Sequence, residues 1–111
     1  MSSAAPKTEW LVMVPDKPNA LQKRLEVRAK HLENITPAHK EGNVPMGGAY
    51  LAEPPKEGET PKMLGSAMVF LASSKEEVVE RLRGDIYTTS GVWDVDNAQI
   101  WPFKTAIRSG L

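Results

Sequence analysis

"MLGSAMVFLASSKEEVVERLRG", residues 63–84, contains a strand that is followed directly by a helix. Its first nine residues are apolar on both faces of an extended chain, with Leu64, Met68 and Phe70 on one face and Ala67, Val69 and Leu71 on the other. Ser73 and Glu76 have the spacing of a capping box, which marks the start of a helix. Gly84 stands where a C-cap is expected. The segment therefore predicts a strand over residues 63–71 and a helix that ends at Gly84.

A strand and a helix of the same kind come first in the chain. "EWLVMV", residues 9–14, is a short apolar run, which favours a strand buried on both faces. Asn19 can cap a helix and Gln22 can return the bond, so we expect a helix to begin directly after Asn19. Pro37 predicts a kink or a break before this helix ends near residue 42.

Two more strands complete the predicted sheet. "NVPMGGAYL", residues 43–51, is the second, and its Gly47-Gly48 pair suggests a bulge or a close approach to the backbone. Residues 52–62 are rich in proline, glycine and charge, which indicates an exposed connection. "VWDVDNAQIWPF", residues 92–103, predicts the fourth strand. The order strand, helix, strand, strand, helix, strand is typical of an α+β, ferredoxin-like βαββαβ fold with a four-stranded antiparallel sheet.

The composition is that of one small domain. We expect a single domain over residues 9–111, preceded by a disordered leader at residues 1–8. The 14 basic and 14 acidic residues are interspersed, which argues against nucleic acid or a membrane as a partner. The chain has no cysteine, and its N-terminus has neither a signal peptide nor an apolar span, so a cytoplasmic protein is expected.

The first helix has an unusual arrangement of charges. On a helical wheel, one stripe contains Arg28 at its centre and an apolar set around it, namely Leu21, Leu25, Leu32 and Ile35. Arg24 and His31 lie along the edge of this stripe. Because a buried arginine needs a polar partner, the pattern indicates that the helix faces a pocket lined by polar groups rather than a dry core.

Two helices on one face of a four-stranded sheet leave the other face uncovered. A sheet face that carries Trp and Met side chains would be a large exposed apolar patch. We therefore expect a homodimer in which two sheets pack face to face.

Several segments resemble the small YciI-like (YCII-related) proteins of the dimeric α/β barrel superfamily. They are "LQKRLEVRAKHL" in the first helix, "GGAYL" in the second strand, "GDIYTTSGVWD", and "IWPF" near the end. The resemblance implies a paired histidine and aspartate, which match His31 and Asp85 here, with Arg28 beside them. It also implies dehydrochlorinase-like chemistry in at least one relative. Ile86 replaces the family's usual proline, and Pro37 interrupts a helix that usually runs on.

A histidine held by a carboxylate suits proton transfer, because the carboxylate fixes the tautomer and raises the basicity of the other ring nitrogen. Structural roles remain open for each residue. His31 can be a hydrogen-bonded histidine at the helix boundary, and Asp85 can cap a single turn in "DIYTTSG". Arg28 can lay its stem along neighbouring leucines and place its head in water.

The remaining candidates are binding residues. We expect the substrate to be bound by Arg24, Met46, Gly48, Tyr87 and Trp93, although core packing is an alternative for the aromatic side chains. No cofactor and no metal are expected, since His39 and Glu41 have no third ligand at a recognisable spacing. Asp94 and Asp96 alternate along the predicted last strand and are read as solvated.

Two hypotheses about function follow. The first is a cofactor-independent enzyme, a lyase or isomerase, that eliminates, dehydrates or isomerises a small aromatic or polyketide-like substrate. In it, His31 is the acid/base group, Asp85 orients it, and Arg28 holds an oxyanion or carboxylate. The second is a non-catalytic dimeric metabolite-binding or accessory protein that uses the same pocket.

Overall fold

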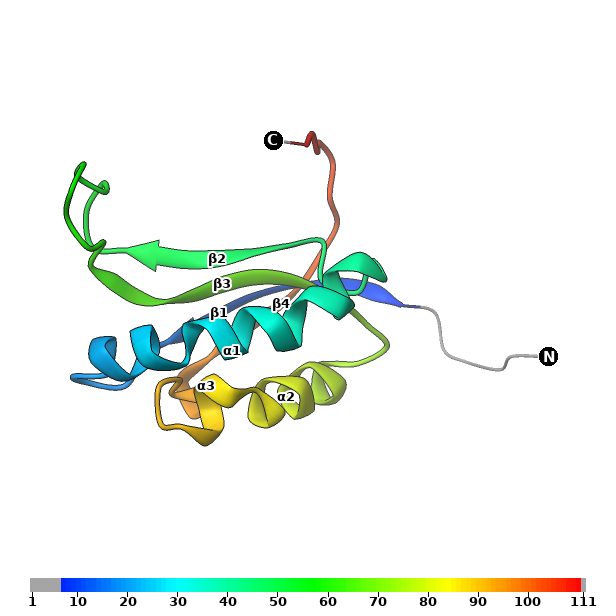
Figure 1. Cartoon of the computed structure of the whole chain (residues 1–111). Coiled ribbons are helices and arrows are strands. Elements are labelled where there is room, and N and C mark those ends of the chain that lie inside the picture. Colours follow the sequence, from blue (N-terminus) through cyan, green and yellow to red (C-terminus); the bar gives the residue numbers. More distant parts are fainter. Residues whose placement is uncertain (1–6, 111) are drawn as a thin grey trace.

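The computed structural model describes residues 7–110, which form an antiparallel sheet with the helices on one of its faces (Figure 1). The strands are β1 (Thr8–Pro15), β2 (Met46–Leu51), β3 (Met63–Ala72) and β4 (Gln99–Phe103). The helices are α1 (Leu21–Lys40), α2 (Lys75–Gly84), the short α3 (Ile86–Thr89) and the 3-10 turn η1 (Val95–Asn97). The predicted ferredoxin-like order is confirmed. Most of the predicted leader lies outside the described residues, and Thr8 already belongs to β1.

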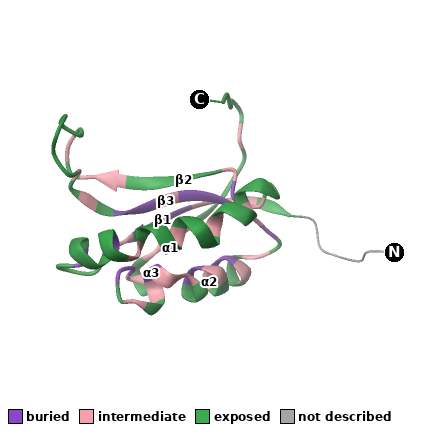
Figure 2. Cartoon of the chain, in the orientation of Figure 1, coloured by how far each residue is buried: buried purple, intermediate pink, exposed green. Residues whose placement is uncertain are grey.

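The sheet has the strand order β2-β3-β1-β4, so the long strands β3 and β1 lie at its centre. Val12 pairs with Met68, and both side chains are buried against the helices. Their neighbours along the strands point to the opposite face, where Met13 is 37% exposed. The prediction that β1 is buried on both faces is therefore wrong for the single chain, because no helix covers that face (Figure 2).

The core lies between the sheet and the helical layer. The largest fully buried side chains come from β1, α2, α3 and the segment after α3: Val12, Val14, Val78, Leu82, Tyr87, Val92 and Trp93. Their burial supplies the hydrophobic free energy that holds α2 and α3 against the sheet. Tyr87 and Trp93, which the sequence placed at a possible binding site, are thus also core residues.

Helix α1 turns a different face to the core than the sequence suggested. Leu21, Leu25 and Leu32 of the predicted apolar stripe are 37%, 38% and 41% exposed. Arg24 is only 3% exposed and is the buried residue of this helix. The apolar contacts of α1 with the core come from Val27, Ile35 and Ala38. The stripe was wrong because Arg24 has buried polar partners that the helical period does not reveal.

Both predicted irregularities of α1 also need correction. Asn19 has a positive φ of 60° and does not cap the helix; Ala20 stands at the N-cap position without a side-chain hydrogen bond. Pro37 lies inside an uninterrupted helix, so the predicted break is wrong. The carbonyl that loses its partner there belongs to Glu33, an exposed residue, where water can replace the missing N–H.

The cap of α2 is shifted by one residue from the prediction. The Ser74 side chain accepts the backbone N–H of Glu77 at 3.1 Å, so Ser74 and not Ser73 is the N-cap. Glu77 and not Glu76 returns the bond, because its carboxylate accepts both the backbone N–H and the hydroxyl of Ser73. The capping-box motif was correctly located, but its register was wrong.

The last strand is shorter than predicted. Only Gln99–Phe103 forms a strand paired with β1, while residues 92–98 contain an isolated bridge of Trp93 to Asp16 and the turn η1. The Asn97 side chain donates to Asp94 at 2.6 Å, and this local bond competes with extended pairing. In β2, the irregularity falls between Tyr50 and Leu51 rather than at Gly47-Gly48. The connection over residues 52–62 is irregular and mostly exposed, as predicted.

Candidate active site

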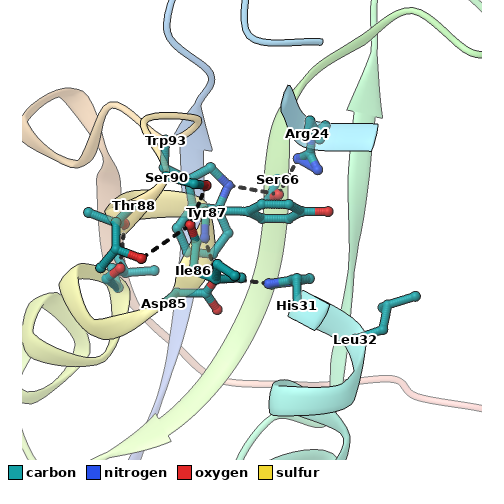
Figure 3. A network of polar contacts seen from close by, with 12 residues as sticks. Arg24, His31, Leu32, Ser66, Asp85, Ile86, Tyr87, Thr88, Ser90 and Trp93 are labelled. Atoms are coloured by element: carbon teal, nitrogen blue, oxygen red, sulfur yellow. Dashed lines mark hydrogen bonds and ion pairs between the residues drawn. The ribbon is translucent and has the colours of Figure 1, made fainter. Parts of the chain in front are cut away.

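His31 and Asp85, which are 54 residues apart in the sequence, are in contact (Figure 3). The Nδ1 atom of His31, on α1, lies 2.9 Å from Oδ1 of Asp85, at the junction of α2 and α3. The two side chains are 12% and 13% exposed. Because an ionised carboxylate only accepts hydrogen bonds, Nδ1 is the donor toward such a carboxylate, and Nε2 remains for a second partner.

Asp85 has a second role in the same place. Its Oδ1 also accepts the backbone N–H of Tyr87 at 2.9 Å, so it is the N-cap of α3, as the structural interpretation of the sequence expected. The capping role and the contact with His31 are therefore compatible. The cap orients the carboxylate, and that orientation in turn fixes the imidazole ring.

Tyr87 lies between two cationic or basic groups. Its ring stacks on that of His31, with the centroids 4.0 Å apart and 17° between the planes. The Arg24 guanidinium carbon lies 4.6 Å from the same centroid. Figure 3 shows the Tyr87 hydroxyl pointing away from Trp93, toward the space beside α1. Burial raises the pKa of Tyr87, against a smaller lowering effect of Arg24 and Arg28, so the side chain stays a neutral phenol at pH 7.

Arg24 is held by a buried polar network. Its Nε donates to Asp16 Oδ2 at 3.0 Å, and a second guanidinium nitrogen donates to the Ser66 hydroxyl. The indole N–H of Trp93 donates to the same hydroxyl at 3.0 Å. Burial raises the pKa of Asp16, although Arg24 opposes this effect, and its Oδ1 atom has no partner among residues 7–110. This network positions the guanidinium above Tyr87.

A cavity of about 1050 Å³ extends along α1 and β2. Its volume is at the upper end of the range for small-molecule sites. Nine residues bring polar or charged side chains to its wall: Arg24, Arg28, His31, Thr36, His39, Ser66, Tyr87, Arg108 and Ser109. Among the described residues that line it, none is Asp or Glu. The wall therefore favours a ligand that is anionic or that becomes anionic in a reaction.

The predicted binding residues separate into two groups. Arg24, Met46, Gly48 and Tyr87 line the large cavity. Trp93 does not; with Asp85 it lines a smaller cavity of about 410 Å³ near Arg81 of α2. The His31–Asp85 contact thus lies where these two cavities approach each other.

Arg28 is exposed and lines the large cavity, and the sequence had placed this residue at a polar-lined pocket rather than in a dry core. It makes no ion pair or hydrogen bond with any residue in the part of the chain that the structure describes. Arg24 has taken the buried position instead, because Asp16 and Ser66 supply the partners that a buried guanidinium needs.

Sequence reasoning missed two residues of the site, Asp16 and Ser66. Both are isolated polar residues at or in predicted strands, and no spacing pattern marks them. Their signal was indirect: a buried arginine in α1 requires an anion, and Asp16 is the carboxylate nearest before the helix.

Two other residues considered from the sequence, Asp96 and His39, have partners within the fold. Asp96 pairs with Arg83 at 2.9 Å, and the ring Nδ1 of exposed His39 lies 2.8 Å from the Val44 carbonyl oxygen. Within residues 7–110, no three side chains of His, Asp or Glu gather closely enough to hold a metal ion. In that same range, no helix is both long and apolar enough to cross a bilayer.

Two known proteins are similar to this chain in sequence. The chain is 42% identical over 106 residues to the aspercryptin biosynthesis cluster protein B of Emericella nidulans, covering 95% of this chain and 67% of that protein. It is 41% identical over 97 residues to the fusaric acid biosynthesis protein 2 of Gibberella fujikuroi, covering 87% and 93%.

A solved structure is also similar. The 5-chloro-2-hydroxyhydroquinone dehydrochlorinase of Burkholderia phenoliruptrix AC1100, in complex with 2,5-dihydroxybenzoquinone, aligns with a TM-score of 0.73 and 25% identity. The alignment covers 86% of this chain and 93% of the dehydrochlorinase. Residues 8–104 match the YCII-related domain family. The chain therefore belongs to the YCII-related domain family, and the resemblance first suggested by its motifs is confirmed.

Proposed function

We propose that this protein is a cofactor-independent enzyme that transfers a proton on a small aromatic or polyketide-like molecule, as in an elimination, dehydration or isomerisation. One observation carries the proposal. His31 is held by Asp85 on one side and by the Tyr87 ring on its face, and it also lines the large cavity. A positioned imidazole at the wall of a ligand-sized space meets the geometric requirement for an acid/base group.

The proposed roles follow from the positions. His31 Nε2 accepts a proton from carbon or from a phenol, and Asp85 keeps Nδ1 protonated and stabilises the imidazolium that forms. The electron pair of the broken C–H bond moves toward the substrate oxygen, where Arg28 balances the negative charge. In an elimination, this electron pair then returns to form a carbon–carbon double bond. The leaving group departs with the electrons of the bond that held it to carbon.

The relatives support the aromatic or polyketide-like substrate class. Two belong, by name, to biosynthesis of small molecules, and the similar solved structure is a dehydrochlorinase with a quinone bound. We propose that this chain shares a reaction of the elimination type, with the His31–Asp85 contact as its acid/base machinery.

The test compares the native protein with the His31→Ala and Asp85→Asn variants. All three are given the same panel of chlorinated hydroxyhydroquinones, hydroxylated aromatic acids and cyclic 1,3-diketones. The loss of substrate and the replacement of substrate protons by deuterium in D2O are followed by NMR. We expect His31→Ala to lower the rate by about 10²- to 10⁴-fold while the protein stays folded. Asp85→Asn is expected to lose less, because the imidazole remains. An unchanged rate in His31→Ala removes the histidine from the mechanism. Ligand binding without turnover by the native protein favours the metabolite-binding alternative.

A further inference from the structure

The large cavity is longer than a single aromatic ring requires. On α1 its lining extends from Arg24 to His39, and 15 residues of helix span about 22 Å. A cavity of about 150 Å³ is enough to hold benzene, whereas this one measures about 1050 Å³. The part of the cavity beyond His31 therefore has room for a further group of the ligand.

The two ends of the cavity have different chemistry. Arg24 bonds to Ser66, which pairs with Ala49 on β2, so these residues mark one end. With Arg28 and His31 added, this end carries two arginines, a histidine and a serine hydroxyl. We call it the polar end.

The other end begins about one helical turn beyond His31. Its wall is formed mainly by Ile35, Val44, Pro45 and Met68, and Gly47 pairs with Met68 across β2 and β3. Figure 1 shows β2 running back alongside α1, so the first residues of β2 lie at the C-terminal end of this helix. We call this the apolar end.

Three polar side chains toward the apolar end, those of Thr36, His39 and Arg108, already have partners. His39 Nδ1 contacts the Val44 carbonyl oxygen, and the Arg108 guanidinium lies 2.7 Å from a Glu9 carboxylate oxygen. Arg28, in contrast, has no partner within residues 7–110. The unsatisfied charge is thus at the polar end and the unfilled apolar wall at the other.

We infer that the natural ligand of this cavity is an amphipathic anion, with an acidic hydroxyaromatic or 1,3-dicarbonyl head at Arg24, Arg28 and His31 and an apolar chain of several carbons along Ile35, Val44 and Met68. This inference rests on the proposed function for the identity of the reacting end. It adds that the substrate is larger than one ring, with an apolar chain attached to the acidic head.

A homologous series of ligands tests the inference without any need for turnover. The probes are 2-hydroxybenzoate and its 6-propyl, 6-pentyl and 6-heptyl derivatives, and their affinities for the native protein are measured by calorimetry. If the chain enters the apolar end, the affinity rises about fourfold for each buried methylene. An affinity that is the same for every chain length, or no binding by any member, overturns the inference.

Two variants separate the ends of the cavity. A Cβ at Gly47 would lie 3.4 Å from Met68 Cβ, an ordinary contact, so Gly47→Val places methyl groups at the apolar end. We expect this variant to lose at least tenfold more affinity for the heptyl derivative than for 2-hydroxybenzoate. Arg28→Met is expected to weaken every member by a similar factor and to leave the dependence on chain length intact. Equal losses along the series in Gly47→Val contradict the assignment.

The outcome is independent of the acid/base proposal. A steep chain-length dependence combined with unchanged turnover in His31→Ala supports the ligand class and rejects the catalytic pair. A flat dependence combined with His31-dependent turnover retains the reaction and rejects the ligand class.

Discussion

Arg24 and Asp16 form a buried ion pair, with Nε and Oδ2 3.0 Å apart and the side chains only 3% and 7% exposed. The pair connects the end of β1 to α1, and Ser66 completes it from β3. Because Arg24 also lies over the Tyr87 ring, this ion pair helps to hold the guanidinium against that ring. Its two members differ in one respect: an aspartate can lose its charge by binding a proton, whereas an arginine cannot.

That difference predicts unequal effects of substitution. Asp16→Asn leaves a buried guanidinium without an anion and is expected to lower the free energy of unfolding by about 3–5 kcal/mol. Arg24→Met is expected to cost less, because Asp16 can then be protonated. Urea unfolding at pH 7 measures both. A smaller loss in Asp16→Asn than in Arg24→Met contradicts the explanation.

The Arg24→Met variant also has a predicted pH dependence. Burial already raises the pKa of Asp16 above its ordinary value of 3.8, and loss of Arg24 removes the opposing effect. The folded state then binds this proton more tightly than the unfolded state does. The stability of the variant, relative to the native protein, should therefore increase as the pH falls from 7 toward 4. A relative stability that is constant over this range argues against protonation of Asp16.

The stacking of Tyr87 on His31 predicts that the ring, more than the hydroxyl, positions the imidazole. Tyr87→Phe keeps the stack, whereas Tyr87→Leu removes it. In NMR spectra, the ring protons of His31 are expected to lose an upfield ring-current shift in Tyr87→Leu and to keep it in Tyr87→Phe. His39 serves as the internal control. Turnover should fall further in Tyr87→Leu, and equal spectra and rates in the two variants would contradict this role.

The cap of α2 predicts an acid-dependent loss of stability. Hydrogen bonds from Ser73, assisted by Arg81, lower the pKa of Glu77 from its ordinary value of 4.5. The charged form is thus favoured in the folded state, and its contribution is present above pH 4.5 and lost as the pH falls through the lowered pKa.

Glu77→Gln is therefore expected to be less stable than the native protein at pH 7, and the two melting temperatures should converge at acidic pH. Glu76→Gln changes the same charge without touching Ser73 and is the matched control. A difference between Glu77→Gln and the native protein that persists unchanged at pH 2 would show that the pKa of Glu77 is not involved.

The uncovered sheet face supports the predicted homodimer. Met46, Val69, Leu11 and Trp101 are successive cross-strand partners on the face opposite the helices. Trp101 is 60% exposed and Met46 is 55% exposed. Val69 between them is only 3% exposed, so the exposed apolar surface lies at the two ends of this row, and a second copy of the same face can cover it.

We expect light scattering at micromolar concentration to give twice the mass of the chain, and Trp101→Glu to give the mass of one. Leu25→Glu, at an exposed leucine on α1, changes the same charge away from the sheet and is expected to leave the dimer intact. A monomer mass for the native protein overturns the prediction.

Much of the fold was predictable because its signals are local. The apolar runs of β1 and β3, the serine and glutamate before α2, and the order of the elements all act within a few residues. The errors fell where a local signal competed with another contact. Asp94 bonded to Asn97 and shortened the last strand, and Glu77 rather than Glu76 reached back to Ser73.

The candidate site was predictable only in part. His31 and Asp85 were identified through a family motif, since nothing in their own surroundings indicates that residues 54 positions apart meet. The sequence by itself determined the order of the strands and helices and the presence of basic side chains on α1, because both follow from residue type and period. Only the tertiary structure decided which of these side chains is buried. Arg24 is inside and Arg28 faces the cavity because Asp16 and Ser66, brought together by the pairing of β1 with β3, can satisfy one guanidinium at that position.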